Sequence, residues 1–225
     1  MRQQNEVQND IIGIIGAKGE GKSYLCKQLY RNAERAAVCD TKAEYASGYI
    51  TSSREELAKY MQREKFHIIF RPNDEEDFDF FCRCVYAAGK IFAVIEEIDF
   101  WCSANYSPPG LNKIVQYGRT QLVDPAYTTR RFPEISRSLT GQTDWFVLFR
   151  ISEPRDLEGL AKRFGKSIAG KVSRLRNHAS IRINVKEFRS NDDSDFSGDG
   201  AGSGVFHSEP AAKNSGGSPG GDSKQ

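Results

Sequence analysis

Residues 16–23 read Gly16-Ala17-Lys18-Gly19-Glu20-Gly21-Lys22-Ser23 and match the phosphate-binding loop pattern G-x-x-x-x-G-K-[ST] at every fixed position. An apolar run, Ile11–Ile15, precedes the motif, and a helical pattern begins near Ser23. Glycines in such a loop let successive backbone N–H groups turn toward phosphates, at a helix N-terminus that favours anions. This context argues against a glycine-rich turn that fits the pattern by chance, and we expect a nucleotide to bind here.

The motif assigns roles to individual residues, and the expected ligands are ATP and Mg²⁺. Lys22 would neutralise the β and γ phosphates, and the Ser23 hydroxyl would ligate Mg²⁺. The predicted nucleotide-binding residues are Gly16, Ala17, Lys18, Gly19, Glu20, Gly21, Lys22, Ser23 and the residue that follows, Tyr24.

A second motif is the apolar run Ile91–Ile95, which ends in two carboxylates, Glu96 and Glu97. A buried parallel strand of this kind places the acids at the carboxyl edge of the sheet, where the phosphate loop also lies. By their order along the strand, we predict that Glu96 holds the metal and Glu97 acts as the general base. Asp99 competes for either role, and the alternative is an ordinary solvated strand end.

The fold class follows from short apolar runs that alternate with helical patterns. This alternation predicts an α/β fold with a mainly parallel sheet flanked by helices. The predicted strands are Ile11–Ile15, Ala37–Cys39, His67–Phe70, Ile91–Ile95, Ala126–Thr129 and Trp145–Ile151.

Length and composition predict one main domain. The chain has 225 residues, 38% of them hydrophobic, and a net charge of +2. Residues 1–189 would form the P-loop domain, and residues 190–225, rich in Gly, Ser, Asp and Asn, a disordered C-terminal tail. The five cysteines fit neither a disulfide framework nor a zinc site, and the absence of a long apolar run predicts a cytosolic protein without a transmembrane segment.

Other classes of P-loop protein fit less well. A guanine-specific GTPase would need an N-K-x-D motif, and Asn112-Lys113-Ile114-Val115 lacks the aspartate. A small-molecule kinase remains possible, although such kinases rarely need a glutamate directly after the metal-binding acid.

Several further motifs, taken in order, resemble the FtsK–HerA superfamily of DNA-pumping ATPases. They are Asp40-Thr41-Lys42-Ala43-Glu44-Tyr45, Glu96-Glu97, Tyr117-Gly118-Arg119, Arg130-Arg131-Phe132-Pro133-Glu134-Ile135-Ser136-Arg137 and Gln142-Thr143-Asp144. Within that superfamily, the small size resembles the genome-packaging ATPases of tailless phages with an internal membrane. The resemblance implies a RecA-like core, a homo-oligomeric ring with ATP sites between subunits, and double-stranded DNA as substrate.

The resemblance also implies roles for single residues. Arg119 falls where such proteins place an arginine that reaches the neighbouring subunit's ATP, with Arg131 and Arg137 as substitutes and a plain surface arginine as the alternative. The superfamily commonly carries a γ-phosphate-sensing glutamine at the end of its fourth strand. This chain reads Thr128-Thr129-Arg130 there instead, so Thr129 or Arg130 would take the sensor role.

The leading hypothesis is an ATP-hydrolysing motor that packages a viral genome into a preformed capsid. Its further partners would be capsid vertex or portal proteins, and it would work in the host cytoplasm or in the virion at a unique vertex. DNA contact without sequence specificity would fall to basic residues after Arg155, namely Lys162, Arg163, Lys166, Lys171, Arg174, Arg176, Arg182, Lys186 and Arg189.

Two alternatives belong to other classes. One is a phage assembly or secretion ATPase of the zonula-occludens-toxin-like type, which usually carries a transmembrane segment. The other is a nucleotide-gated binding switch, which would need no general base such as Glu97.

Overall fold

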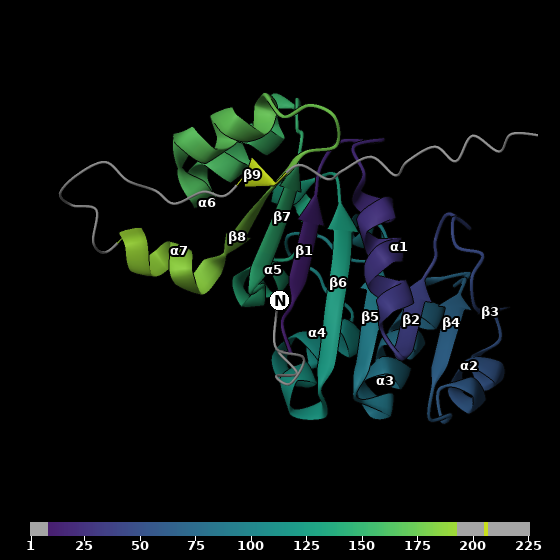
Figure 1. Cartoon of the computed structure of the whole chain (residues 1–225). Coiled ribbons are helices and arrows are strands. Elements are labelled where there is room, and N and C mark those ends of the chain that lie inside the picture. Colours follow the sequence, from purple (N-terminus) through teal and green to yellow (C-terminus); the bar gives the residue numbers. More distant parts are fainter. Residues whose placement is uncertain (1–8, 193–204, 207–225) are drawn as a thin grey trace, which may run out of the picture.

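One β-sheet runs through the molecule, and helices cover both of its faces (Figure 1). The computed structural model describes residues 9–192 and 205–206, and within these the sheet has nine strands in the order β3-β4-β2-β5-β6-β1-β7-β8-β9. Strands β1 to β7 run parallel, whereas β8 pairs antiparallel with β7 and β9 antiparallel with β8. The strands are β1 (Ile12–Ile15), β2 (Arg35–Cys39), β3 (Tyr49–Thr51), β4 (Phe66–Phe70), β5 (Ile91–Ile95), β6 (Val123–Thr129), β7 (Trp145–Phe149), β8 (Ser180–Asn184) and β9 (Val205–Phe206).

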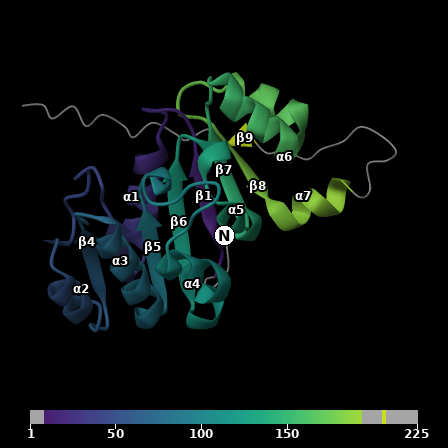
Figure 2. The same cartoon turned by 180° about the vertical axis from the view of Figure 1, so that it is seen from behind.

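Helix α1 packs on one face of the sheet, and α3 and α4 pack on the other, as the two opposite views show (Figures 1 and 2). Helix α6 lies on the same face as α3 and α4, over β7 and β8. The helices are α1 (Lys22–Asn32), α2 (Arg54–Tyr60), α3 (Glu75–Ala88), α4 (Pro109–Tyr117), α5 (Arg137–Gln142), α6 (Pro154–Ser173) and α7 (Val185–Asp192), with short 3-10 turns η1 (Ile98–Phe100), η2 (Gly118–Gln121) and η3 (Phe132–Glu134). No helix in the described part of the chain combines the length and apolarity needed to cross a membrane.

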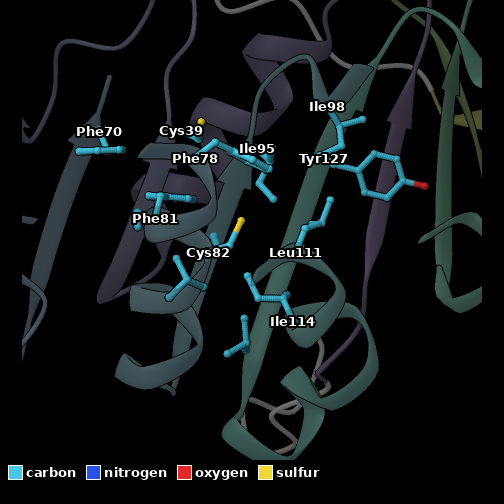
Figure 3. Packing of buried hydrophobic residues seen from close by; sticks show 14 of the residues in the cluster. Cys39, Phe70, Phe78, Phe81, Cys82, Ile95, Ile98, Leu111, Ile114 and Tyr127 are labelled. Atoms are coloured by element: carbon cyan, nitrogen blue, oxygen red, sulfur yellow. The ribbon is translucent and has the colours of Figure 1, made fainter. Parts of the chain in front are cut away.

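The central strands are apolar on both sides because helices bury both faces. In β5, Ala93 and Ile95 join the cluster under α3 and α4, while Val94 joins the cluster under α1. Figure 3 shows the first of these clusters, in which Phe78 and Phe81 of α3 lie over the sheet. Such two-sided burial produces near-continuous apolar runs in parallel strands. The apolar runs therefore determine which segments form the central strands, and the polar residues that follow these strands lie at the carboxyl edge of the sheet.

The predicted α/β fold with a mainly parallel sheet is confirmed. Strand β6 lies between β1, which leads into the phosphate loop, and β5, which leads into the acidic pair. The sequence did not predict three of the strands, β3, β8 and β9. Strand β6 begins at Val123, earlier than the predicted start at Ala126. Proline cannot donate a backbone hydrogen bond, so Pro125 in β6 argues against a central strand at this point. The structure tolerates it because Pro125 pairs only with Ala93 of β5, and the pairing of β6 with β1 starts one residue later.

The predicted tail, residues 190–225, lies outside the described residues except at two places. Residues 190–192 form the end of α7, and Val205–Phe206 pair with β8 as strand β9.

Candidate nucleotide-binding site

The loop between β1 and α1 is anchored to the ends of both neighbouring strands. The Gly16 N–H donates to the Thr129 carbonyl at 3.3 Å, and the Ala17 N–H donates to the Arg150 carbonyl at 2.9 Å. Gly16 has no room for a side chain, because a Cβ there would lie 2.6 Å from Phe149 Cβ. Gly19 and Gly21 have φ values of 81° and 109°, which residues with a side chain rarely adopt. The predicted phosphate loop therefore has the backbone that its glycines suggested.

Unpaired donors line this loop at the start of α1. In residues 9–192, the backbone N–H groups of Gly21, Lys22 and Ser23 donate to no other group. Free N–H groups at a helix N-terminus, next to a lysine, form a setting that suits an anion such as a phosphate.

Lys22 is 7% exposed, and its Nζ donates to the carbonyls of Gly16 at 2.9 Å and Ala17 at 3.0 Å. Burial lowers the pKa of Lys22, and the charges of Glu97 and Glu96 partly oppose that effect. The structure thus brings Lys22 and the two predicted acids into electrostatic contact.

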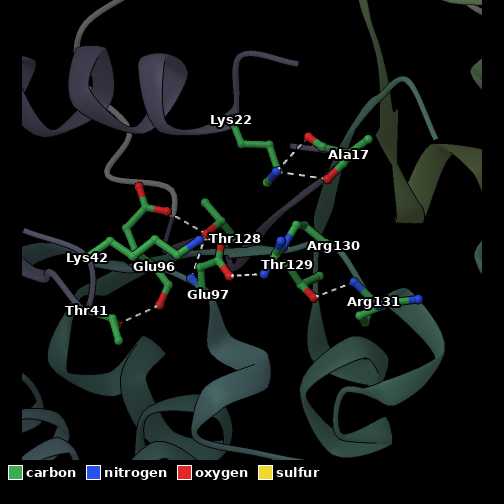
Figure 4. Close-up of polar contacts among 11 residues, drawn as sticks. Ala17, Lys22, Thr41, Lys42, Glu96, Glu97, Thr128, Thr129, Arg130 and Arg131 are labelled. Atoms are coloured by element: carbon green, nitrogen blue, oxygen red, sulfur yellow. Dashed lines mark hydrogen bonds and ion pairs between the residues drawn. The ribbon is translucent and has the colours of Figure 1, made fainter. Parts of the chain in front are cut away.

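Glu96 follows β5 and is held by two hydroxyl groups, of which Figure 4 shows that of Thr128. The Tyr45 hydroxyl donates to Oε1 at 2.8 Å, and the Thr128 hydroxyl donates to Oε2 at 2.6 Å. Burial raises the pKa of Glu96, whereas the hydrogen bonds from Thr128 and Tyr45 work against that rise. A nearby cation would favour the ionised form, so this carboxylate fits a metal site.

Glu97 is held by two cations. Lys42 Nζ lies 2.5 Å from Oε1, and Arg130 Nη2 lies 2.9 Å from Oε2. Burial acts to raise the pKa of Glu97, but the hydrogen bond and charge of Lys42, with the charges of Arg130 and Lys22, outweigh burial and lower it. Glu97 is therefore a stable carboxylate.

The residues present fit Mg²⁺. A hydroxyl and a carboxylate are the hard oxygen ligands that this ion takes, and Ser23 in the first turn of α1 and Glu96 would supply them. Asp99 lies in η1, where its Oδ1 is buried without a hydrogen-bond partner in the described chain. Tyr24 points away from the core, with 60% of its surface exposed, and accepts a hydrogen bond from Gln28.

Arg119 is not brought to this site within one chain. It lies in η2, before β6 begins, and its Nη2 is 2.6 Å from Oδ1 of Asp144, which directly precedes β7. Both residues therefore lie at the amino edge of the sheet, opposite the phosphate loop. A role toward a neighbouring subunit stays a prediction.

The two substitute arginines lie after β6. Arg131 Nη1 is 3.9 Å from Asp156, and Arg137 starts α5 with an exposed side chain. Neither contacts the acidic pair in the described structure.

Of the two predicted sensor residues, Arg130 reaches the acidic pair. Thr129 is fully buried, and its Oγ1 accepts a hydrogen bond from the Arg131 N–H at 3.0 Å. Arg130 contacts Glu97 directly, and its Nε is buried without a partner in the described part of the chain.

Sequence reasoning assigned no role in this site to three of its residues: Lys42, Tyr45 and Thr128. Lys42 and Tyr45 belong to the polar segment after β2, where the Asp40 carboxylate accepts hydrogen bonds from the N–H groups of Glu44 and Tyr45. The signal was available, since polar residues directly after a buried strand lie at the same edge as the phosphate loop. Thr128, inside β6, gave no such signal.

A concave surface away from the phosphate loop, here called the basic groove, has a volume of about 620 Å³ and lies between η3, α5 and α6. Arg163 in its wall donates to the Thr140 carbonyl at 2.7 Å. Four cations and one acid contribute to the lining: Arg137, Arg155, Lys162, Arg163 and Glu158. The groove thus has a surplus of positive charge.

Comparison with known proteins gives matches to solved structures alone. No protein-family model matches the sequence, and no curated protein matches it. The genome-packaging NTPase B204 of Sulfolobus turreted icosahedral virus 2, in complex with AMPPCP, superposes with a TM-score of 0.69 at 20% identity, over 80% of this chain and 94% of that chain. B204, the DNA-packaging ATPase of Sulfolobus turreted icosahedral virus, gives 0.67 at 18% identity, over 81% and 95%. The bacterial conjugative coupling protein TrwBΔN70 gives 0.55 at 8% identity, over 80% and 83%.

These similarities agree with the α/β fold and the mainly parallel sheet. The chain has the RecA-like fold of the P-loop NTPases, and the resemblance to packaging ATPases inferred from its sequence is confirmed at the level of the fold.

Proposed function

We propose that this protein is a Mg²⁺-dependent ATPase that translocates double-stranded DNA, and that the DNA is a viral genome entering a preformed capsid. One observation carries the catalytic part: Lys22, which contacts the carbonyls of the phosphate loop, lies at the same edge of the sheet as Glu96 and Glu97 at the end of β5 (Figure 4). A lysine, a metal-binding acid and a second acid at one edge of the sheet are the groups that ATP hydrolysis requires.

Each group has a defined task in this proposal. Lys22 and the free N–H groups of the loop bind the phosphates, and Ser23 and Glu96 hold Mg²⁺. The ion supplies positive charge to the β and γ phosphates. Glu97 accepts a proton from the attacking water as its oxygen bonds to the γ-phosphorus and the β–γ bridge breaks, releasing ADP and phosphate.

The DNA part rests on the basic groove and on the similarity of fold. Arg155 and Lys162 line the groove with largely exposed side chains, and their ion pairs with Glu134 and Glu158 are surface pairs that a phosphate backbone can replace. In this proposal the protein forms a ring, Arg119 of one subunit serves the next, and capsid vertex or portal proteins dock the ring in the host cytoplasm or in the virion.

The test is steady-state ATP hydrolysis with and without long double-stranded DNA, at low and moderate salt. We expect turnover that DNA stimulates and that Lys22→Ala abolishes. Lys22-dependent turnover that ignores DNA would contradict the motor and favour an assembly ATPase.

The groove has its own test. The double variant Arg155→Gln/Lys162→Gln should weaken DNA binding and reduce the slope of log affinity against log salt by about 2, because each phosphate contact contributes about 0.9. Lys59→Gln/Lys65→Gln, near the β3–β4 edge of the sheet and away from the groove, is the charge-matched control. An unchanged slope would exclude the groove as the DNA surface.

One observation favours a second candidate, the nucleotide-gated switch: both oxygens of Glu97 are already paired with cations. A switch would bind ATP and show at most a single turnover. Phosphate release that continues over many cycles would reject it.

A further inference from the structure

Glu97 lies between cations that come from the strands on either side of its own (Figure 4). Lys42 follows β2, Glu97 follows β5 and Arg130 follows β6, and these three strands are neighbours in the sheet. Each cation takes one carboxylate oxygen, Lys42 at 2.5 Å and Arg130 at 2.9 Å. The side chain of Glu97 is 9% exposed, whereas those of Lys42 and Arg130 are 36% and 38% exposed. The two cations therefore hold the Glu97 carboxylate from both sides.

The backbone of Glu97 is strained. Its φ of 51° and ψ of 60° lie in the left-handed region, which residues other than glycine rarely occupy. The Glu97 N–H donates to the Thr128 hydroxyl at 2.8 Å. Strained conformations persist where the surrounding contacts hold them in place. Loosening one ion pair would therefore let the Glu97 side chain change position.

Arg130 is the contact that can exchange partners. Its buried Nε–H donates to no group in the described part of the chain, so the guanidinium has donor capacity to spare. Arg130 follows β6 and Glu97 follows β5, at the edge of the sheet where Lys22 and the phosphate loop also lie (Figure 4). Guanidinium groups engage phosphate oxygens in bidentate fashion. A phosphate at the loop would compete with Glu97 for Arg130.

We propose that Lys42 and Arg130 form a two-cation clamp that restrains Glu97, and that the terminal phosphate of ATP opens this clamp by drawing Arg130 off the carboxylate. Lys42 keeps its contact and continues to restrain Glu97 after this exchange. The inference rests on the proposed binding of ATP at Gly16–Ser23, and it adds a role for Lys42 and a trigger for Glu97.

A binding cycle tests the exchange of Arg130. The affinities of Mg·AMPPCP and Mg·ADP are measured by calorimetry for the wild type, Glu97→Gln, Arg130→Gln and the double variant. Glu97→Gln should tighten AMPPCP binding on the order of fivefold, the scale of a partly exposed ion pair, and leave ADP binding unchanged. That gain should disappear in the Arg130→Gln background.

The same gain in both backgrounds would overturn the clamp, because Glu97 would then act on the phosphates through its charge alone. If the wild type binds AMPPCP and no gain appears at all, the clamp fails while the nucleotide site stands. A wild type that binds neither nucleotide would overturn the nucleotide site and the clamp together.

Turnover tests the restraint by Lys42. Lys42→Gln should raise kcat in the absence of DNA on the order of fivefold with KM unchanged, and Lys42→Arg should restore the wild-type rate. Lys65→Gln, which removes an exposed lysine paired with Glu34 at 2.7 Å, is the matched control. A lower kcat in Lys42→Gln would overturn the restraint.

Discussion

Thr128 connects the two carboxylates of the site through one hydroxyl group. This hydroxyl donates to Glu96 at 2.6 Å and accepts the Glu97 N–H at 2.8 Å, and the residue is fully buried. Both acids therefore depend on a side chain that neither motif contains.

Thr128→Val keeps the shape of this side chain and removes both hydrogen bonds. The variant should lose about 1–3 kcal/mol of unfolding free energy, because it leaves a buried N–H and a buried carboxylate oxygen without a partner. It should also need more Mg²⁺ to reach half-maximal ATP hydrolysis. Urea denaturation and a Mg²⁺ titration measure the two effects. The control is Tyr45→Phe, which removes only one hydrogen bond to Glu96. A Thr128→Val variant that is as stable as this control, or more stable, would contradict the role of Thr128.

Asp124 in β6 gives stability a pH dependence that is separate from the site. Burial raises its pKa to about 7, and the charge of Asp10 adds to the rise. The folded protein then holds a proton that the unfolded chain loses near pH 4, so stability falls as pH rises from about 4 to 7. Above that window no further loss occurs.

Asp124→Asn removes this dependence. The variant should be more stable than the wild type at pH 8, and the difference should shrink as pH falls toward 5. Urea denaturation at several pH values measures it, with the exposed Glu64→Gln as control. A difference that stays constant with pH would show that Asp124 titrates normally in the folded state.

At the residue scale, the sequence predicted the site residues that a motif of fixed spacing or the end of an apolar strand marks. Lys22 and the pair Glu96 and Glu97 were found because a motif or a strand end marks them, and the structure brings them together. Lys42 follows β2 and Thr128 lies in β6, and their contacts with the acids follow from strand order, which the sequence pattern does not contain.

At the scale of elements, glycines show where helices approach closely. A Cβ on Gly110 of α4 would lie 2.6 Å from the carbonyl oxygen of Asp79 in α3. A Cβ on Gly170 of α6 would meet nothing within 4 Å. Close packing therefore requires a glycine at position 110, whereas no contact requires one at position 170.

The two alanine substitutions should have opposite signs. Gly110→Ala should cost about 1–3 kcal/mol of unfolding free energy through overpacking of α3 against α4. Gly170→Ala should add about 0.5–1 kcal/mol, because alanine loses less backbone entropy in a helix. Chemical denaturation of both variants measures the two changes in unfolding free energy. A Gly110→Ala variant as stable as the wild type would contradict the close packing of α3 against α4.

Element prediction succeeded where strands are apolar on both faces and failed at the edges. β5 was predicted with its observed bounds, since helices bury both of its sides. β3 has two exposed residues of three, and β8 carries Arg182 on an exposed position, so neither shows a continuous apolar run.

At the scale of the whole molecule, the sheet order gathers the site. β1 is followed by the phosphate loop, β5 by the acidic pair and β2 and β6 by the two clamp cations, and all four strands run parallel. Their carboxyl ends therefore meet at one edge, which is where ligands bind in open α/β sheets. The sequence predicted the parallel sheet, but the order β2-β5-β6-β1 emerged only from the structure.

The most direct measurement compares ATP binding and ATP turnover in the wild type, Lys22→Ala and Glu97→Gln. We expect the wild type to bind ATP and release phosphate over many cycles, and Lys22→Ala to lose binding. Glu97→Gln should bind ATP at least as tightly as the wild type and lose turnover by a factor on the order of 10²–10⁴, the usual contribution of a general base. Undiminished phosphate release by Glu97→Gln would show that this carboxylate is not the base and would contradict the proposed site.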